Sequence, residues 1–236
     1  MPLASDIGFT ETVKAIQTRK GSRDIYAHVD WRTEITQDLI DCTAKMRSIF
    51  VATVNADGHP YIQHRGGPPG FLHVLDKHTI AFADFKGNRQ GSTQGNLQDN
   101  PRTFVFMIDY LNQRRIKLWG RSEIIEDDPD LLARLMPDRE AYRALPEQVF
   151  KFTVEAWDIN CPQHIPKRVE AEDFVRMVQS KDTEIAALKA EIERPEPKAL
   201  PEQEDETAEV AENAAADAAA TVAADVAAPD ASATSS

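Results

Sequence analysis

Two glycine-containing segments rich in basic residues, both within Tyr61–Asn96, decide how this chain is interpreted. The first reads Tyr-Ile-Gln-His-Arg-Gly-Gly-Pro-Pro-Gly-Phe (61–71), and the second reads Phe-Ala-Asp-Phe-Lys-Gly-Asn-Arg-Gln (82–90). Glycines let a ligand approach backbone N–H groups closely, and arginines offer paired donors that match phosphate oxygens. A helix expected over 92–99 would add the positive end of its dipole. The pattern favours an anion, above all a phosphate, between the two segments. The alternative is two ordinary turns with exposed basic residues.

Hydrophobic patterning around this stretch predicts a β-rich domain. The expected helices are five in number and cover 5–19, 34–46, 92–99, 130–136 and 170–194. Strands joined mostly by short turns pair antiparallel, so the fold class is mainly β with flanking helices (α+β), built on a small barrel of six to seven strands. The expected strands cover 48–54, 61–65, 71–75, 79–85, 101–110, 114–125 and 148–157.

Charge is distributed unevenly along the chain. The whole chain carries a net charge of −12, but residues 1–194 account for only −3 of it. Residues 195–236 hold ten acidic residues, one lysine and no aromatic residue, so we expect a disordered, acidic, Ala-rich tail after one folded domain over 1–194. The mildly acidic folded part lacks a dense basic stripe, which argues against nucleic-acid binding.

Other function classes are also disfavoured by the sequence. No apolar run approaches the roughly 20 residues that a membrane helix needs, and no secretion signal is visible, so a cytoplasmic protein without membrane contact is expected. Cys42 and Cys161 have no metal-ligand spacing, and no metal site is predicted. Cys42 shares one apolar helical stripe with Ile35, Leu39 and Met46, so it is most simply a core residue.

The motifs at 61–71 and 82–90 resemble those of the pyridoxamine 5'-phosphate oxidase-related FMN-binding proteins, which have a split-barrel fold. The resemblance covers roughly residues 24–169 and includes Asn-Cys-Pro-Gln-His at 160–164. It implies a homodimer with FMN at the subunit interface and an oxidoreductase acting on a small-molecule substrate. The alternatives are a flavin-binding or redox-sensing module without turnover, or the same fold with deazaflavin or haem as its ligand.

One segment departs from true pyridoxamine-phosphate oxidases. Those enzymes carry an Arg-Leu-His-Asp-Arg type segment near the C-terminus that holds the phosphate of the substrate. This chain has Gln-His-Ile-Pro-Lys-Arg at 163–168 instead. A vitamin B6 oxidase activity is therefore not expected from the resemblance.

The expected strand 114–125 has two contrasting faces. Alternation places Ile116, Leu118 and Gly120 on the face that suits a barrel interior. The other face carries Arg115, Lys117, Trp119 and Arg121, and it suits a planar anionic ligand, a subunit contact or plain solvent. The resemblance places the flavin outside the barrel and makes Arg115 its contact on this face.

Pattern and resemblance together give a set of candidate site residues. A proton donor is expected at His164, although a Cys161–His164 nucleophile pair is disfavoured because Pro162 stiffens the turn. Taken alone, His64 would more often be a packed histidine than a ligand. The candidate cofactor contacts are Gln63, His64, Arg65, Gly66, Lys86, Asn88, Arg89, Gln90, Asn96, Arg115, Trp157, Cys161 and Gln163.

The expected C-terminal helix is charged but carries a near-heptad apolar series. Val178, Ile185, Leu188 and Ile192 form this series, which is too short to establish a coiled coil from sequence. The helix either flanks a dimer or packs on the barrel.

Overall fold

The computed structural model describes residues 2–138, 142–160 and 162–194. By its contacts the chain forms two units, Met1–Phe174 and Val175–Ser236. The expected disordered tail over 195–236 lies outside the described residues. In the part of the chain that the structure describes, no helix combines the length and the apolar character needed to cross a bilayer.

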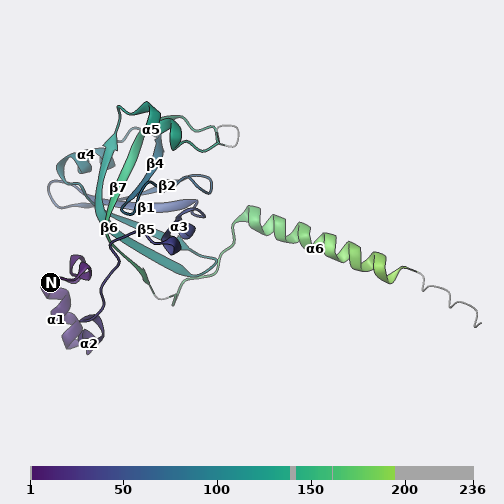
Figure 1. Ribbon diagram of the computed structural model, residues 1–236, viewed down its shortest axis with the longest axis horizontal. Helices are drawn as coiled ribbons and strands as arrows, with labels where there is room; N and C mark the ends of the chain where they lie inside the picture. The colour runs from purple at the N-terminus through teal and green to yellow at the C-terminus, as the bar shows by residue number, and fades with distance from the viewer. Residues whose placement is uncertain (1, 139–141, 161, 195–236) are drawn as a thin grey trace, which may run out of the picture. The chain divides into compact units, whose positions relative to one another are not determined.

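A seven-stranded, wholly antiparallel sheet dominates the first unit, which confirms the predicted fold class. The sheet is strongly curved, and its strand order is β2-β1-β5-β6-β7-β4-β3 (Figure 1). The strands are β1 (Ser48–Val54), β2 (Pro60–Gly66), β3 (His73–Val74), β4 (Thr79–Phe85), β5 (Arg102–Asp109), β6 (Arg114–Ile125) and β7 (Pro146–Asn160). Only β3 is much shorter than expected.

Helices of the first unit flank the sheet as predicted, with three differences near the N-terminus, one of which is that the helix expected over 34–46 covers only Gln37–Thr43. The expected helix over 5–19 is two elements, because the chain breaks at Gly8 and restarts where the Thr10 hydroxyl caps the Val13 N–H. A short helix at 23–26 was not expected. The helical elements are η1 (Ala4–Ile7), α1 (Glu11–Arg19), α2 (Arg23–Tyr26), α3 (Gln37–Thr43), α4 (Ser92–Asp99), α5 (Pro129–Arg134) and α6 (Ala171–Ile192).

The core lies inside the curved sheet and is sealed by α3. Leu39 and Cys42 on α3 are buried, and burial raises the pKa of the Cys42 thiol, which suits the core role predicted for it. Ile116 and Leu118 are 1% and 0% exposed, which confirms the predicted interior face of β6. Gly120 continues that face at a register shift, where a Cβ would lie 2.0 Å from the Thr153 carbonyl oxygen, so only glycine fits.

The opposite face of β6 is covered by the N-terminal segment rather than left open. Trp31 stacks on Trp119 with ring centroids 4.2 Å apart, while Phe9 packs 4.9 Å from Trp31. Phe104 of β5 meets Trp119 edge-on at 4.9 Å. We call Phe9, Trp31, Phe104 and Trp119 the aromatic layer. The Lys117 ammonium lies 5.6 Å and 5.4 Å from the ring centroids of Trp31 and Trp119, within range of a cation–π contact.

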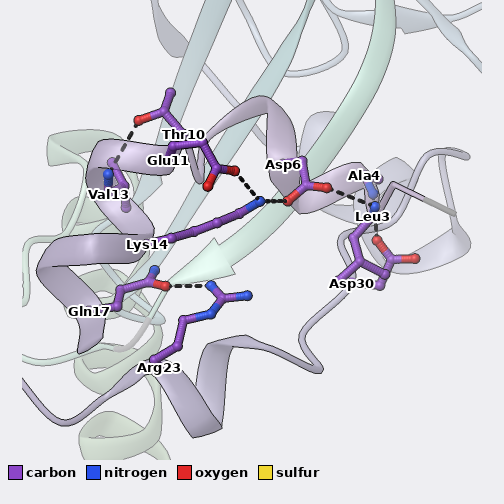
Figure 2. A network of polar contacts seen from close by, with 10 residues as sticks. All are labelled: Leu3, Ala4, Asp6, Thr10, Glu11, Val13, Lys14, Gln17, Arg23 and Asp30. Carbon is purple, nitrogen blue, oxygen red and sulfur yellow. Dashed lines mark hydrogen bonds and ion pairs between the residues drawn. The ribbon is translucent and has the colours of Figure 1, made fainter.

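A polar network fixes the segment that carries Phe9 (Figure 2). The Lys14 ammonium bridges Asp6 at 2.9 Å and Glu11 at 3.0 Å, and this contact lowers the pKa of the Asp6 carboxyl. The Ala4 N–H donates to Asp30 at 2.7 Å, just before Trp31 in sequence. The network therefore ties η1 and α1 together and links them to the loop that delivers Trp31.

Candidate functional site

A polar pocket of about 170 Å³ opens where β2, β4 and β7 meet the start of α4. Its walls come from the segments 61–71 and 82–90, from the first turn of α4, and from residues of β6, β7 and the loop after β6. The lining residues are Tyr61, Gln63, Arg65, Asp84, Phe85, Gly87, Asn88, Arg89, Gln90, Gly91, Ser92, Thr93, Gln94, Ile124, Glu126, Glu147 and Gln148.

The N-terminal end of α4 lines this pocket. Gly91 is the N-cap in the left-handed conformation (φ +73°), and no side chain caps the first N–H groups of the helix. Ser92, Thr93 and Gln94 form the first turn, and all three line the pocket. Uncapped N–H groups and the positive end of the helix dipole favour an anion at this place.

Gln63 connects β2 to this helix end. Its Oε1 atom accepts a hydrogen bond of 2.7 Å from the Thr93 hydroxyl, and Thr93 itself is buried. The bond fixes the first turn of α4 against the strand. Gln63 therefore lines the pocket, but its side-chain amide oxygen already accepts a hydrogen bond from Thr93.

Arg65 and Asp84 form an ion pair at the inner wall of the pocket. The Arg65 Nε atom lies 3.1 Å from Asp84 Oδ1, and Arg65 Nη2 donates to Asp84 Oδ2 at 3.4 Å. Asp84 also accepts a 3.0 Å hydrogen bond from Gln148 Nε2. Burial raises the pKa of the Asp84 carboxyl, and the Arg65 guanidinium partly opposes that rise.

Arg89 occupies the outer rim and is held more loosely. Its φ of +56° is in the left-handed region, inside a turn where the Asn88 side-chain oxygen accepts from the Gln90 N–H at 3.2 Å. The Arg89 side chain is 65% exposed, and its Nε lies 3.5 Å from Glu147 Oε1. A ligand can therefore recruit this guanidinium at little cost.

The lining holds two arginines and three carboxylates, on Asp84, Glu126 and Glu147. Side-chain charge alone does not make the pocket positive. The uncapped first turn of α4 and the exposed Arg89 supply donors that internal partners leave available, whereas Arg65 is engaged by Asp84. A phosphate fits best at the α4 end of the pocket.

Five of the predicted cofactor contacts line the pocket, namely Gln63, Arg65, Asn88, Arg89 and Gln90. Four others on or beside the same elements, His64, Gly66, Lys86 and Asn96, do not. His64 points away from Gln63, and its Nε2 lies 2.7 Å from the Ser48 hydroxyl. Lys86 is exposed beside the pocket. The Asn96 Nδ2 donates to the Thr53 hydroxyl at 2.9 Å, which ties α4 to β1.

Gly66, also predicted as a contact, has a packing role in the structure. A Cβ at this position would lie 2.9 Å from the Arg47 carbonyl oxygen and 3.0 Å from the His64 ring. The glycine lets the chain turn closely past Arg47, whose carbonyl oxygen accepts the Gly67 N–H at 3.1 Å.

The remaining predicted residues that the structure describes lie at the start of β6, in the last part of β7 or just after β7, and they do not line the pocket. Arg115 Nη2 donates to the Gln163 carbonyl oxygen at 3.5 Å, so these two predicted contacts do meet. His164 is exposed with a φ of +64°. Trp157 is 1% exposed and donates its indole N–H to the Glu34 carbonyl oxygen at 2.8 Å, which makes it a core residue. Cys161 lies outside the described residues.

Sequence reasoning missed Asp84, Glu147 and Gln148 as pocket residues. A signal for Asp84 was present, because a carboxylate inside the otherwise apolar run 79–85 has to be paired when it is buried. Glu147 and Gln148 come from β7, which is distant in sequence. Their place became visible only from the pairing of Asp84 with Gln148 in the β4–β7 register.

The curved antiparallel sheet of seven strands places the chain in the split-barrel class. Residues 35–161 match the family model described as pyridoxamine 5'-phosphate oxidase. The chain belongs to the pyridoxamine 5'-phosphate oxidase family, as the sequence motifs indicated.

Several solved structures resemble the chain at low sequence identity. HupZ of Group A Streptococcus is 21% identical, with 57% of this chain and 99% of that chain covered and a TM-score of 0.45. An FMN-binding protein from Syntrophomonas wolfei is 12% identical, with coverage of 62% and 97% and a TM-score of 0.42. HutZ, the heme storage protein of Vibrio cholerae, is 16% identical, with coverage of 52% and 93% and a TM-score of 0.38. No curated protein matches the chain. Similarities this low establish no ligand for it.

Proposed function

We propose that the chain binds FMN by its phosphate in the α4 pocket and acts as an FMN-dependent oxidoreductase on a small molecule. One observation carries the proposal: the uncapped first turn of α4, Arg89 and Arg65 all line one pocket. Membership of the pyridoxamine 5'-phosphate oxidase family supports it.

The residues that would hold the phosphate are those at the α4 end. The N–H groups of Ser92 and Thr93 are positioned to donate, and Arg89 adds a charge-assisted donor from the rim. Asn88 and Gln90 supply further polar groups beside it. Arg65 would contribute through its charge, since Asp84 already holds its guanidinium.

The size of the pocket limits how much of an FMN molecule it can enclose. Sites that enclose a whole cofactor measure roughly 300–1,000 Å³, whereas this one measures about 170 Å³. It suits a phosphate and the adjoining part of the ribityl chain. The flavin ring would then lie outside it, which supports a homodimer whose second subunit completes the site.

Bound flavin would supply hydride or electron transfer. The chain itself would bind the phosphate and hold the ring in place. Arg115, which contacts the Gln163 carbonyl oxygen, and exposed His164 lie at the ends of β6 and β7. We assign His164 the proposed role of proton donor to the substrate, with Arg115 and Gln163 as ring contacts.

The competing ligands differ in what they demand of the pocket. Haem iron takes an axial ligand such as histidine, cysteine, methionine or tyrosine. Among the described lining residues Tyr61 is the only side chain of this kind, and no histidine is present. Deazaflavin shares the ring shape and phosphate chemistry, so it remains the nearest competitor. A flavin-binding module without turnover would use the same pocket.

Two measurements on the purified full-length protein test the proposal. Absorption spectroscopy should show the two visible bands of oxidised flavin, and mass spectrometry of the ligand released by denaturation should give the mass of FMN. A Soret band, the mass of a deazaflavin, or a colourless protein that takes up no added FMN would overturn the cofactor. If NAD(P)H does not reduce the bound flavin, or if no acceptor in a panel reoxidises it, the oxidoreductase activity is overturned. The protein would then be a flavin-binding module without turnover.

A further inference from the structure

Helix α6 carries a series of exposed apolar side chains along one face. Phe174, Val178 and Ile185 have exposed fractions of 60%, 43% and 49%, while Leu188 and Ile192 are 52% and 82% exposed. No residue of α6 is buried among the residues that the structure describes. A soluble helix with such a series usually buries it against a partner.

The spacing of the series is that of a two-stranded coiled coil. Positions 174, 178, 181, 185, 188 and 192 follow one another at intervals of four and three. Val178, Ile185 and Ile192 occupy heptad position a, while Phe174, Lys181 and Leu188 occupy position d. Branched residues at a combined with leucine at d, here Leu188 alone, favour two strands in a parallel coiled coil.

Lys181 is the one polar residue in this seam. Its ammonium lies 2.6 Å from Glu184 Oε2 on the same helix, so its head leaves the seam while its methylene stem stays beside it. A single polar residue in a seam lowers stability but restricts which register and partner the helix accepts.

The charges that flank the seam select a second copy in parallel orientation. Glu184 occupies position g and Lys189 position e, five residues further on. In a parallel, in-register pair each Glu184 faces Lys189 of the other copy, which gives two attractive contacts. An antiparallel pair brings g against g, where Glu184 and Glu191 repel each other, and e against e, where Asp182 and Lys189 attract, so it mixes both signs. Among the described residues the parallel pair gives attractive contacts without a repulsive one.

The helix also needs such a partner for its own stability. Its 22 residues span about 33 Å at 1.5 Å per residue. Most of the stability of a helix in a protein comes from packing of its apolar face, and none of the described residues of α6 is buried.

We propose that α6 pairs in parallel, in register, with α6 of a second copy of this chain. The pairing is independent of the FMN site, because none of the pocket-lining residues lies on α6.

Disulfide trapping in the full-length chain tests the pairing. Ile185→Cys places two thiols within disulfide reach across the seam, whereas Thr183→Cys, on the outer face, serves as the matched control. The unsubstituted chain, with Cys42 and Cys161, gives the background. Under mild oxidation we expect a cross-linked dimer from Ile185→Cys at least tenfold above both controls. Equal cross-linking at 183 and 185, or none at 185, would overturn the pairing.

A charge exchange tests the two Glu184–Lys189 contacts, while the cross-link at position 185 tests the orientation. In the Ile185→Cys background, Glu184→Lys alone and Lys189→Glu alone each place like charges across a parallel seam, while a mixture of the two variants restores both contacts. We expect the mixed dimer to exceed the statistical proportion severalfold. A statistical proportion would contradict the parallel pair. Circular dichroism and FMN uptake of each variant show that it has folded, and loss of cross-linking with FMN uptake intact would remove this proposal alone.

Discussion

The pocket beside α4 and the aromatic layer on β6 share one sequence feature, which is basic side chains on or beside an outward strand face. The two regions differ in what these side chains contact. At the pocket, Arg65 and Arg89 meet carboxylates from β4 and β7, and an uncapped helix start leaves donors available. At the aromatic layer, Lys117 lies over two indoles, and a segment from the N-terminus closes the face. A segment distant in sequence therefore decides whether a cationic strand face becomes a candidate binding site or part of the packed interior.

The two regions should therefore respond differently to substitution. The aromatic layer stabilises the fold, so its loss should lower the free energy of unfolding. The rim of the pocket is exposed, so changes there should alter ligand affinity and leave stability nearly unchanged. Asp84 combines the two properties, because it is buried like the aromatic layer and also lines the pocket.

Trp31→Ala should give the largest effect. Trp31 is 8% exposed, stacks on Trp119 and packs against Phe9, so truncation should lower the free energy of unfolding by about 3–5 kcal/mol. Denaturant titration measures this. Tyr26→Ala, which removes only an edge contact of a 41% exposed ring, is the control and should cost much less. Equal losses from the two variants would mean that the layer is not a packed part of the fold.

Asp84→Ala should come next. It removes the hydrogen-bond acceptor of both Arg65 and Gln148 in a mostly buried position and leaves their donors unpaired, which should cost about 3 kcal/mol of stability. Asp158→Ala is the matched control, because its 3.6 Å pair with Lys117 is more exposed and should contribute under 1 kcal/mol. Thermal unfolding of both variants checks the order, and a larger loss for Asp158→Ala would reverse our ranking.

The same carboxyl should show in the pH dependence of stability. Burial raises the pKa of Asp84, so the folded chain holds a proton over a range where the unfolded chain has released it. The contribution of Asp84 to stability is therefore fullest below its unfolded pKa, falls as the pH rises through the folded pKa, and is constant above it. Subtracting the Asp84→Ala profile from the wild-type profile should reveal this fall. A difference that rises with pH would contradict the assigned direction.

Arg89→Ala should affect ligand affinity alone. Removing a charge-assisted contact should weaken FMN binding by about 1.5–3 kcal/mol. The free energy of unfolding should hardly change, because the Arg89 side chain is 65% exposed and its pair with the Glu147 carboxylate is long, at 3.5 Å. Arg121→Ala on β6, also exposed and paired with Glu155 at 2.8 Å, is the control and should leave FMN affinity unchanged. Retention of full affinity by Arg89→Ala would remove this residue from the site.

Glu147→Gln should give the smallest effect and the opposite sign. It removes a carboxylate that competes with a phosphate for Arg89, so FMN should bind more tightly by about 0.5 kcal/mol. Isothermal titration of the variant beside the wild type measures the gain. Weaker binding would indicate that Glu147 positions Arg89 instead of competing for it.

Local patterns predicted most of the fold because they act within one element. The bounds of β1, β4, α4 and β6 agree with the sequence expectation, since alternation and flanking turn residues set them locally. The break at Gly8 was not predicted, because it depends on Trp31, whose ring a Cβ at that position would meet at 2.5 Å. Contacts between distant segments leave little trace in local periodicity.

The site was predictable to the same extent. Arg65, Asn88 and Arg89, which line the pocket, were predicted as contacts because glycines and turn residues beside cations are a local signal. The ion pair of Arg65 with Asp84 and the closure of the β6 face by Trp31 both join segments far apart in sequence. Trp157 was placed at the ligand by resemblance, and only the packing of β7 against the 31–35 loop shows its ring in the core.

The most direct test of the phosphate pocket compares FMN with riboflavin, which has the same ring and ribityl chain but no phosphate. Fluorescence titration of the wild-type protein should give an FMN affinity at least tenfold above that of riboflavin, and Arg89→Ala should shrink this ratio toward one. Equal affinities for the two ligands in the wild type, or binding of neither, would contradict the account.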